Sequence, residues 1–119
     1  MLSTAVRARQ QSRHLPAFVL LLIAEAPTHG GALQSALAAR LPSLRADSAA
    51  VYRTLKQLEK DGDVVAEWDT TGAGPPIRVY RVTPQGRESL ERWRADVEDR
   101  LANLRAFLDA HDALRRRRA

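Results

Sequence analysis

The sequence of 119 residues contains no cysteine. This absence excludes a disulfide framework, an iron–sulfur cluster, a zinc finger and a thiol nucleophile. Aromatic residues make up only 5% of the chain, so a hydrophobic core must consist mostly of leucine, valine and alanine. The three histidines, His14, His29 and His111, lie too far apart in the sequence to suggest a metal site. No apolar run approaches the roughly 20 residues that a transmembrane helix needs, so we expect no membrane partner.

Basic residues gather at the two ends of the chain. The formal net charge is +5, yet residues 1–13 contain three arginines and no acid, and residues 115–118 are four consecutive arginines. Residues 14–114 therefore carry a net charge of −2. Basic ends of this kind are often solvated tails. The charge distribution thus favours a nucleic-acid partner less strongly than a uniformly basic domain would.

The apolar segment at residues 15–24 has two interpretations. It follows a basic start and precedes Ala24-Glu25-Ala26, so it resembles an export signal with a small-x-small cleavage pattern. It also fits a buried helix over residues 15–26, with Pro16 in the first turn and Pro27 just past the end. We favour the helix, because the basic region is long for a signal and the next segment is too small to fold well alone.

Two further helices are predicted, over residues 31–40 and about 47–60. The second of them carries Val51, Leu55 and Leu58, which recur at the spacing of one helix face. An Asp-Ser pair stands at its start, where either residue is a good N-cap, and a glycine follows its last residue.

After residue 62, the apolar residues no longer recur with the helical period of 3.6 residues but with a period of 2. Residues 64–69 and 77–82 alternate apolar and polar side chains and predict a β-hairpin. The loop between them, residues 70–76, is longer than a tight turn needs and should project. Trp68, on the first strand, is expected to pack against the body of the domain.

The last predicted helix starts at the Thr83-Pro84 cap and runs to about residue 114. Its apolar positions recur every three or four residues and form a heptad-like seam. The seam consists of Leu90, Trp93, Val97, Leu101, Leu104, Leu108 and His111, and the first six are the predicted dimerisation residues. A helix of about 30 residues is about 45 Å long, so its far half cannot bury the seam on its own domain. A second copy related by a two-fold axis is the simplest partner.

This order of elements indicates a mainly α fold with a small β-hairpin, a winged helix-turn-helix followed by a long C-terminal dimerisation helix. In such a fold the third helix lies in the major groove of DNA. Its outward face would carry Ala49, Tyr52, Arg53, Lys56 and Lys60.

These side chains suit the groups that DNA presents. Arg53 can bind guanine or a phosphate with its fork of N–H groups, and Tyr52 and the two lysines suit phosphates. The small Ser48 and Ala49 would allow close approach to base edges. In the alternative, each long cation lies on a solvated helix face, and Tyr52 packs partly buried.

The stretch from about residue 14 to residue 90 resembles the PadR family of bacterial transcriptional regulators. Three segments carry the resemblance. They are Ala-Pro-Thr-His-Gly at 26–30, Ser-Ala-Ala-Val-Tyr-Arg-Thr-Leu-Lys-Gln-Leu-Glu at 48–59 and Gly-Pro-Pro-Ile-Arg-Val-Tyr-Arg-Val-Thr-Pro-Gln-Gly at 74–86. They are similar to the family's turn before the second helix, its recognition-helix motif and its wing, in the same order and at the same spacing.

The sequence departs from the family pattern at four positions. Gly31 replaces a tyrosine, Ala50 a glycine, Arg53 a proline and Ile77 a wing cation. Arg53 adds a group that can read a base or bind a phosphate. The loss of the cation at position 77 leaves Arg78 as the best wing contact. The target sequence of relatives therefore cannot be transferred to this chain.

The resemblance implies a homodimer with repressor-like binding to a two-fold related site on double-stranded DNA. It also implies a cytoplasmic, nucleoid-associated protein without a cofactor. Some family members bind flat aromatic ligands between the C-terminal helices of the dimer and are then released from DNA. Trp93, together with Val97, is the predicted site for such a ligand, although plain dimer packing is the alternative role of Trp93.

The predicted organisation has four parts, namely a basic arm at 1–13, the DNA-binding domain at 14–82, the dimerisation helix at 83–114 and a basic tail at 115–119. Arg7, Arg9 and Arg13 of the arm could add phosphate contacts. An alternative function is a winged-helix module that binds proteins without reading DNA. We expect no enzyme, because the sequence offers no nucleophile–base pair and no recognisable pair of carboxylates.

Overall fold

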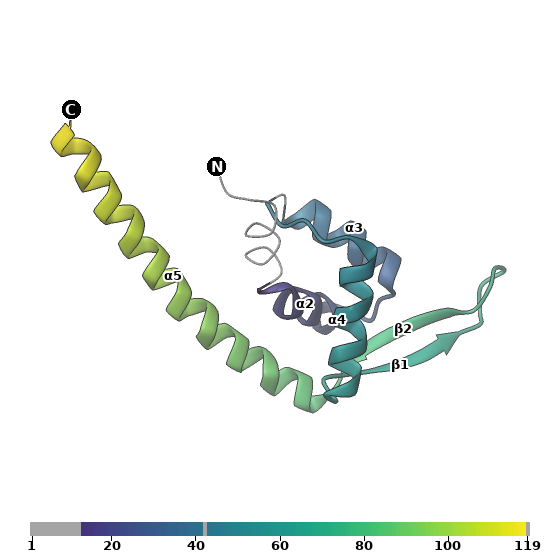
Figure 1. The fold of residues 1–119 in the computed structure, drawn as a ribbon. Coiled ribbons are helices and arrows are strands. Elements are labelled where there is room, and N and C mark those ends of the chain that lie inside the picture. Colours follow the sequence, from purple (N-terminus) through teal and green to yellow (C-terminus); the bar gives the residue numbers. More distant parts are fainter. Residues whose placement is uncertain (1–12, 42, 119) are drawn as a thin grey trace.

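The structure is a computed structural model that describes residues 13–41 and 43–118. Within these residues, three helices precede a two-stranded hairpin, and a long helix follows it (Figure 1). The elements are α2 (Leu15–Glu25), α3 (Gly30–Arg40), α4 (Ser48–Lys60), β1 (Val64–Asp69), β2 (Ile77–Val82) and α5 (Pro84–Arg118). This architecture confirms the mainly α winged helix-turn-helix. Arg7 and Arg9 of the predicted arm lie outside the described residues.

The hydrophobic core lies between α2, α3, α4 and the base of the hairpin. Nearly every side chain of α2 is apolar, and Val19 and Leu20 in its middle are fully buried. The core cluster consists of Leu15, Val19, Leu20, Ile23, Leu33, Leu37, Val51, Leu55, Leu58, Val64 and Tyr80. Residues 15–25 thus form a central core helix, as the helix interpretation of this segment predicts.

Side-chain caps fix where the short helices begin. The His29 ring accepts a hydrogen bond at Nδ1 from the backbone N–H of Ala32, at 3.3 Å, and so caps α3. Asp47 accepts one from the N–H of Ala50, at 2.8 Å, and caps α4. The chain leaves α4 through Gly62, whose φ of +85° favours glycine.

The hairpin is antiparallel, with Trp68 directly opposite Arg78. Its loop, residues 70–76, is exposed and projects from the body, as the sequence predicts (Figure 1). One pairing was not predicted. Thr28, in the turn before α3, exchanges backbone hydrogen bonds of 3.2 and 2.8 Å with Tyr80 on β2. This bridge ties the base of the hairpin to the helical body.

The expected packing role of Trp68 is wrong. The side chain is 66% exposed, because it lies in the outer half of the hairpin, beyond the buried base at Val64. Its ring contacts another hairpin residue instead. The guanidinium carbon of Arg78 lies 5.9 Å from the ring centroid of Trp68, within the range of a cation–π contact.

The start of α5 is clamped to the turn between α4 and β1. Thr83 caps α5 by accepting from the N–H of Gly86 at 3.0 Å, and its hydroxyl donates to the Gly62 carbonyl at 2.6 Å. Gly86 lies so close to the carbonyl of Asp63 that any Cβ there would overlap it. The buried Ser89 donates to the Asp63 carboxylate at 2.7 Å. The clamp fixes the direction in which α5 leaves the domain.

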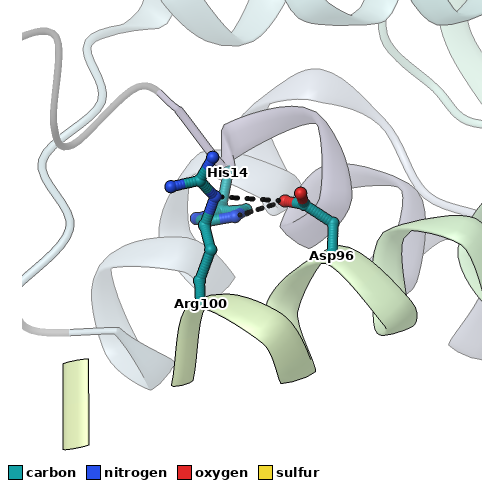
Figure 2. A network of polar contacts seen from close by, with 3 residues as sticks. All are labelled: His14, Asp96 and Arg100. Atoms are coloured by element: carbon teal, nitrogen blue, oxygen red, sulfur yellow. Dashed lines mark hydrogen bonds and ion pairs between the residues drawn. The ribbon is translucent and has the colours of Figure 1, made fainter. Parts of the chain in front are cut away.

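A second polar contact joins α5 to the beginning of α2. His14 Nε2 lies 3.1 Å from a carboxylate oxygen of Asp96, and Arg100 Nε lies 3.4 Å from the same oxygen (Figure 2). The His14 ring also meets the Trp93 ring edge-on, with centroids 6.1 Å apart. The first half of α5 is therefore held to the body.

The second half of α5 runs away from the body (Figure 1). The 35 residues of the helix span about 52 Å. Its apolar side chains beyond residue 100 are exposed, and they are Leu101, Leu104, Phe107, Leu108 and Leu114. The helix passes the predicted end at residue 114 and includes four arginines there, because arginine is a good helix former and cations are favourable at a helix C-terminus. None of the described helices is long and apolar enough to cross a membrane.

Candidate nucleic-acid interface

Helix α4 presents one polar face to solvent. This recognition face consists of Ala49, Tyr52, Arg53, Lys56 and Lys60, all of which are exposed. The opposite face of α4 packs into the core through the three apolar residues that the sequence identified. The structure therefore confirms which face of the helix points outward.

Tyr52 packs against α3 and is also exposed to solvent, so its contact with a phosphate stays a prediction. A Cβ on Gly30 would lie 2.7 Å from the Tyr52 hydroxyl, so the ring packs directly on the first residue of α3. The side chain is nevertheless 54% exposed. A substituted residue at position 30 would displace this ring. The absence of a Cβ at Gly30 therefore lets the tyrosine ring pack closely against α3 while the residue stays about half exposed.

A groove of about 310 Å³ separates the recognition face from the hairpin. This recognition groove is lined by Ala49, Tyr52, Arg53, Lys56, Glu59, Arg78 and Tyr80. Helix α4 supplies five of these residues and β2 supplies two. The structure thus brings the predicted wing contact, Arg78, to the same concave surface as the predicted helix contacts.

Arg78 is held by three neighbours. Its Nη2 donates to Glu59 Oε2 at 2.7 Å, which joins β2 to the last turn of α4. Its guanidinium carbon lies 5.8 Å from the Tyr80 ring centroid and a similar distance from that of Trp68. Glu59 is not among the residues predicted from the sequence. Its position seven residues after Tyr52 puts both side chains on the same side of α4. This spacing could have indicated that Glu59 lies beside the recognition face.

The groove remains positive despite its one carboxylate. Arg53, Lys56 and Arg78 bring three cations, and Glu59 offsets one of them. Burial raises the pKa of the Tyr80 hydroxyl, although the charge of Arg78 lowers it in part. Tyr80 is therefore a neutral hydrogen-bond donor at physiological pH. Three long cations beside tyrosine hydroxyls are the donor set that a phosphate backbone attracts.

Nearby acidic residues lie off this surface. Asp63 is buried beneath α5, and Asp69 accepts bonds from Thr71 within the hairpin loop. Glu67 and Asp69 alternate with Trp68 along β1, so both point to the face of the hairpin away from Arg78. Among the described residues there is no cluster of three or more acidic or histidine side chains that could hold a metal ion.

The predicted seam on α5 divides into two parts. Leu90 and Trp93 pack, partly buried, against the core of their own domain. Val97 is 41% exposed. The exposure continues through Leu101, Leu104 and Leu108. In the single chain, Trp93 therefore presents only part of its ring at the edge of the exposed seam, beside Val97.

Comparisons with known proteins agree with this geometry. Residues 19–92 match a protein family described as "Transcriptional regulator PadR-like family". The search of curated proteins gives no significant match. A solved structure of a conserved protein of unknown function, described as a potential transcriptional factor, is 33% identical, with a TM-score of 0.76. That match covers 87% of this chain and 92% of the other.

Two further solved structures are of PadR proteins. A PadR family transcriptional regulator from Eggerthella lenta is 25% identical, with a TM-score of 0.75, over 88% of this chain and 90% of its own. Bacillus subtilis PadR, solved in complex with operator DNA, is 23% identical, with a TM-score of 0.62. It shares the fold over 68% of this chain and 46% of its own.

Proposed function

Because the chain belongs to the PadR-like family of transcriptional regulators, we propose that it is a homodimeric repressor that binds a two-fold related DNA site. The observation that carries this proposal is the recognition groove. It joins the exposed face of α4 to the wing and places Arg53, Lys56 and Arg78 around one concave surface.

In this proposal the N-terminal half of α4 enters the major groove. Ser48 and Ala49 are small and exposed, so the helix start can approach base edges closely. Arg53 lies at the centre of the recognition face and reads guanine or holds a phosphate, while Tyr52 and Lys56 hold phosphates. The hairpin then reaches the neighbouring backbone with Arg78.

The exposed half of α5 supports the dimer in this proposal. Leu101, Leu104 and Leu108 form an apolar stripe on a helix that extends beyond its own domain. An equivalent stripe from a second copy is the natural cover, because a two-fold axis brings the same surface of both chains together. Two recognition helices would then face two half-sites about one helical turn apart. The Bacillus subtilis complex with operator DNA supports the DNA-binding part of this proposal.

The proposal also includes release of the protein from DNA by a flat aromatic ligand. Val97 is exposed and Trp93 is partly buried next to it, so a dimer would bring two such pairs toward its axis. Planar molecules stack favourably on indole rings. A ligand of this kind would bind between the two α5 helices and change their separation.

A selection of genomic DNA fragments with the purified full chain tests the proposal. The expected result is enrichment of a small set of fragments that bind in a gel shift and resist excess unrelated DNA. Binding to all fragments alike, with strong salt dependence, would contradict specific recognition and indicate a charge effect of the basic ends. Absence of DNA binding at moderate salt would favour a protein-binding winged helix.

A further inference from the structure

Glu59 is the one carboxylate among the described residues that line the recognition groove. A free carboxylate at a surface that meets phosphates would oppose binding. The Glu59 carboxylate is instead paired, at 2.7 Å, with Arg78 on the hairpin. The two side chains are 33% and 44% exposed, so the pair is partly shielded by the groove.

This pair is the polar connection between α4 and the outer part of the hairpin. Within the described residues, the other polar side-chain contacts of residues 65–79 stay inside the hairpin, namely Glu67 with Arg81 and Asp69 with Thr71. The base of the hairpin is fixed separately, by the backbone bridge between Thr28 and Tyr80. Without the pair, the hairpin would be attached to the body at its base alone.

The geometry also orients the guanidinium of Arg78. Aromatic rings of Trp68 and Tyr80 lie 5.9 and 5.8 Å from its central carbon, and the bond to Glu59 uses Nη2. An arginine carries five N–H donors in a rigid plane, so the others stay available for a second acceptor. A lysine in the same place would have neither the plane nor the fork.

We infer that Glu59 is a positioning residue for DNA recognition. It braces the wing against α4 and holds the Arg78 guanidinium in the recognition groove, where the free N–H groups meet a backbone phosphate. Glu59 itself does not touch DNA. The inference rests on the proposed function and deepens it, because it assigns the angle of the wing to one interaction within the protein.

A positioning role and a simple charge effect predict different outcomes for Glu59→Gln. Removal of a negative charge alone would strengthen binding to specific and unrelated DNA by the same factor. The wing contact fixes the register of the protein on its specific site, whereas on unrelated DNA no single register is used. Loss of the brace therefore weakens binding to the specific site, while binding to unrelated DNA keeps or gains affinity. The informative quantity is therefore the ratio of the two affinities. We expect this ratio to fall by about fivefold, which corresponds to about 1 kcal/mol.

The experiment compares full-length variants on the fragment selected by the wild-type protein and on unrelated DNA of equal length. Glu88→Gln is the matched control, because Glu88 is exposed on α5 and has no ion pair within the described chain. Glu59→Gln should add no further loss of the ratio in an Arg78→Ala background, since both act through one contact. Arg78→Lys should lower the ratio as Glu59→Gln does.

Hydrogen exchange of the DNA-free protein tests the brace independently. Glu59→Gln should speed the exchange of backbone amides in the outer hairpin, while Tyr80 at the base keeps its protection. An unchanged affinity ratio, or additive losses in the double variant, would overturn the positioning role, and an unchanged outer hairpin would overturn the brace. If the wild-type protein selects no fragment, the proposed function fails, and the exchange measurement still decides on the brace.

Discussion

Replacement of Leu104 by glutamate should dissociate the proposed dimer. Leu104 is 63% exposed in the single chain. Full burial of a leucine contributes about 1.5–3 kcal/mol, so covering that exposed fraction contributes about 1–2 kcal/mol per copy. The two copies together contribute about 2–4 kcal/mol to the dimer. Loss of this contribution raises the dissociation constant of the dimer by about 30- to 700-fold. Because glutamate must also lose its hydration at the interface, this range is a lower bound.

Sedimentation velocity over a range of protein concentrations measures this constant. Ala102→Glu is the matched control, because Ala102 is exposed and lies two residues earlier on α5, about 200° around the helix axis. The control should dimerise like the wild-type protein. The reasoning would be refuted by a Leu104→Glu variant with wild-type affinity, or by equal dissociation of both variants, since the face of α5 would then be irrelevant.

Three further predictions concern the DNA contacts, the clamp on α5 and the ligand. Arg53→Ala should remove about 1–3 kcal/mol of binding free energy through the loss of discrimination at one base pair of the site. Lys56→Ala should instead weaken binding to all DNA and lower the dependence of log affinity on log salt concentration by about one. Gel shifts on base-substituted fragments measure the first effect, and gel shifts at several salt concentrations measure the second. Gly86→Ala should destabilise the fold by about 1–3 kcal/mol through overpacking, while Gly74→Ala, where a Cβ meets nothing within 4 Å, should leave the thermal unfolding midpoint unchanged. Flat aromatic compounds should quench the fluorescence of Trp93 and release the protein from its DNA site, and a titration without either effect would count against the ligand hypothesis.

The sequence predicted the order and nature of every described element, because the patterns behind them are local. The stripe of Val51, Leu55 and Leu58 has the period of a helix, and all three residues are buried. The two strands have a period of 2 and pair in the predicted hairpin. The predicted cap of α4, Asp47, also acts within a few residues of its helix.

The features that the sequence did not reveal depend on distant contacts. The bridge between Thr28 and Tyr80 joins residues more than 50 positions apart, and a single-residue bridge leaves no periodic signal. The ion pair between Glu59 and Arg78 likewise joins two separate elements and leaves no periodic signal in the sequence. Trp68 was expected to be covered because indole is large and apolar, but the hairpin extends beyond the helices that could cover it.

The site residues were partly predictable for the same reason. Arg53 and Lys56 follow from the face of α4 that remains once the apolar stripe is assigned to the core. Arg78 follows from its place on the wing. These three cations share one groove with Glu59 because of the angle between α4 and the hairpin. The sequence does not show this angle, and the structure does.

Footprinting of the fragment that the wild-type protein selects tests the central claim most directly. The account predicts protection of two half-sites related by a two-fold axis, with centres about 34–36 Å or one helical turn apart. Protection should be lost with Leu104→Glu at concentrations where that variant is monomeric. A single unpaired protected half-site, or no protected sequence at all, would contradict a dimeric regulator that reads DNA through α4 and the wing.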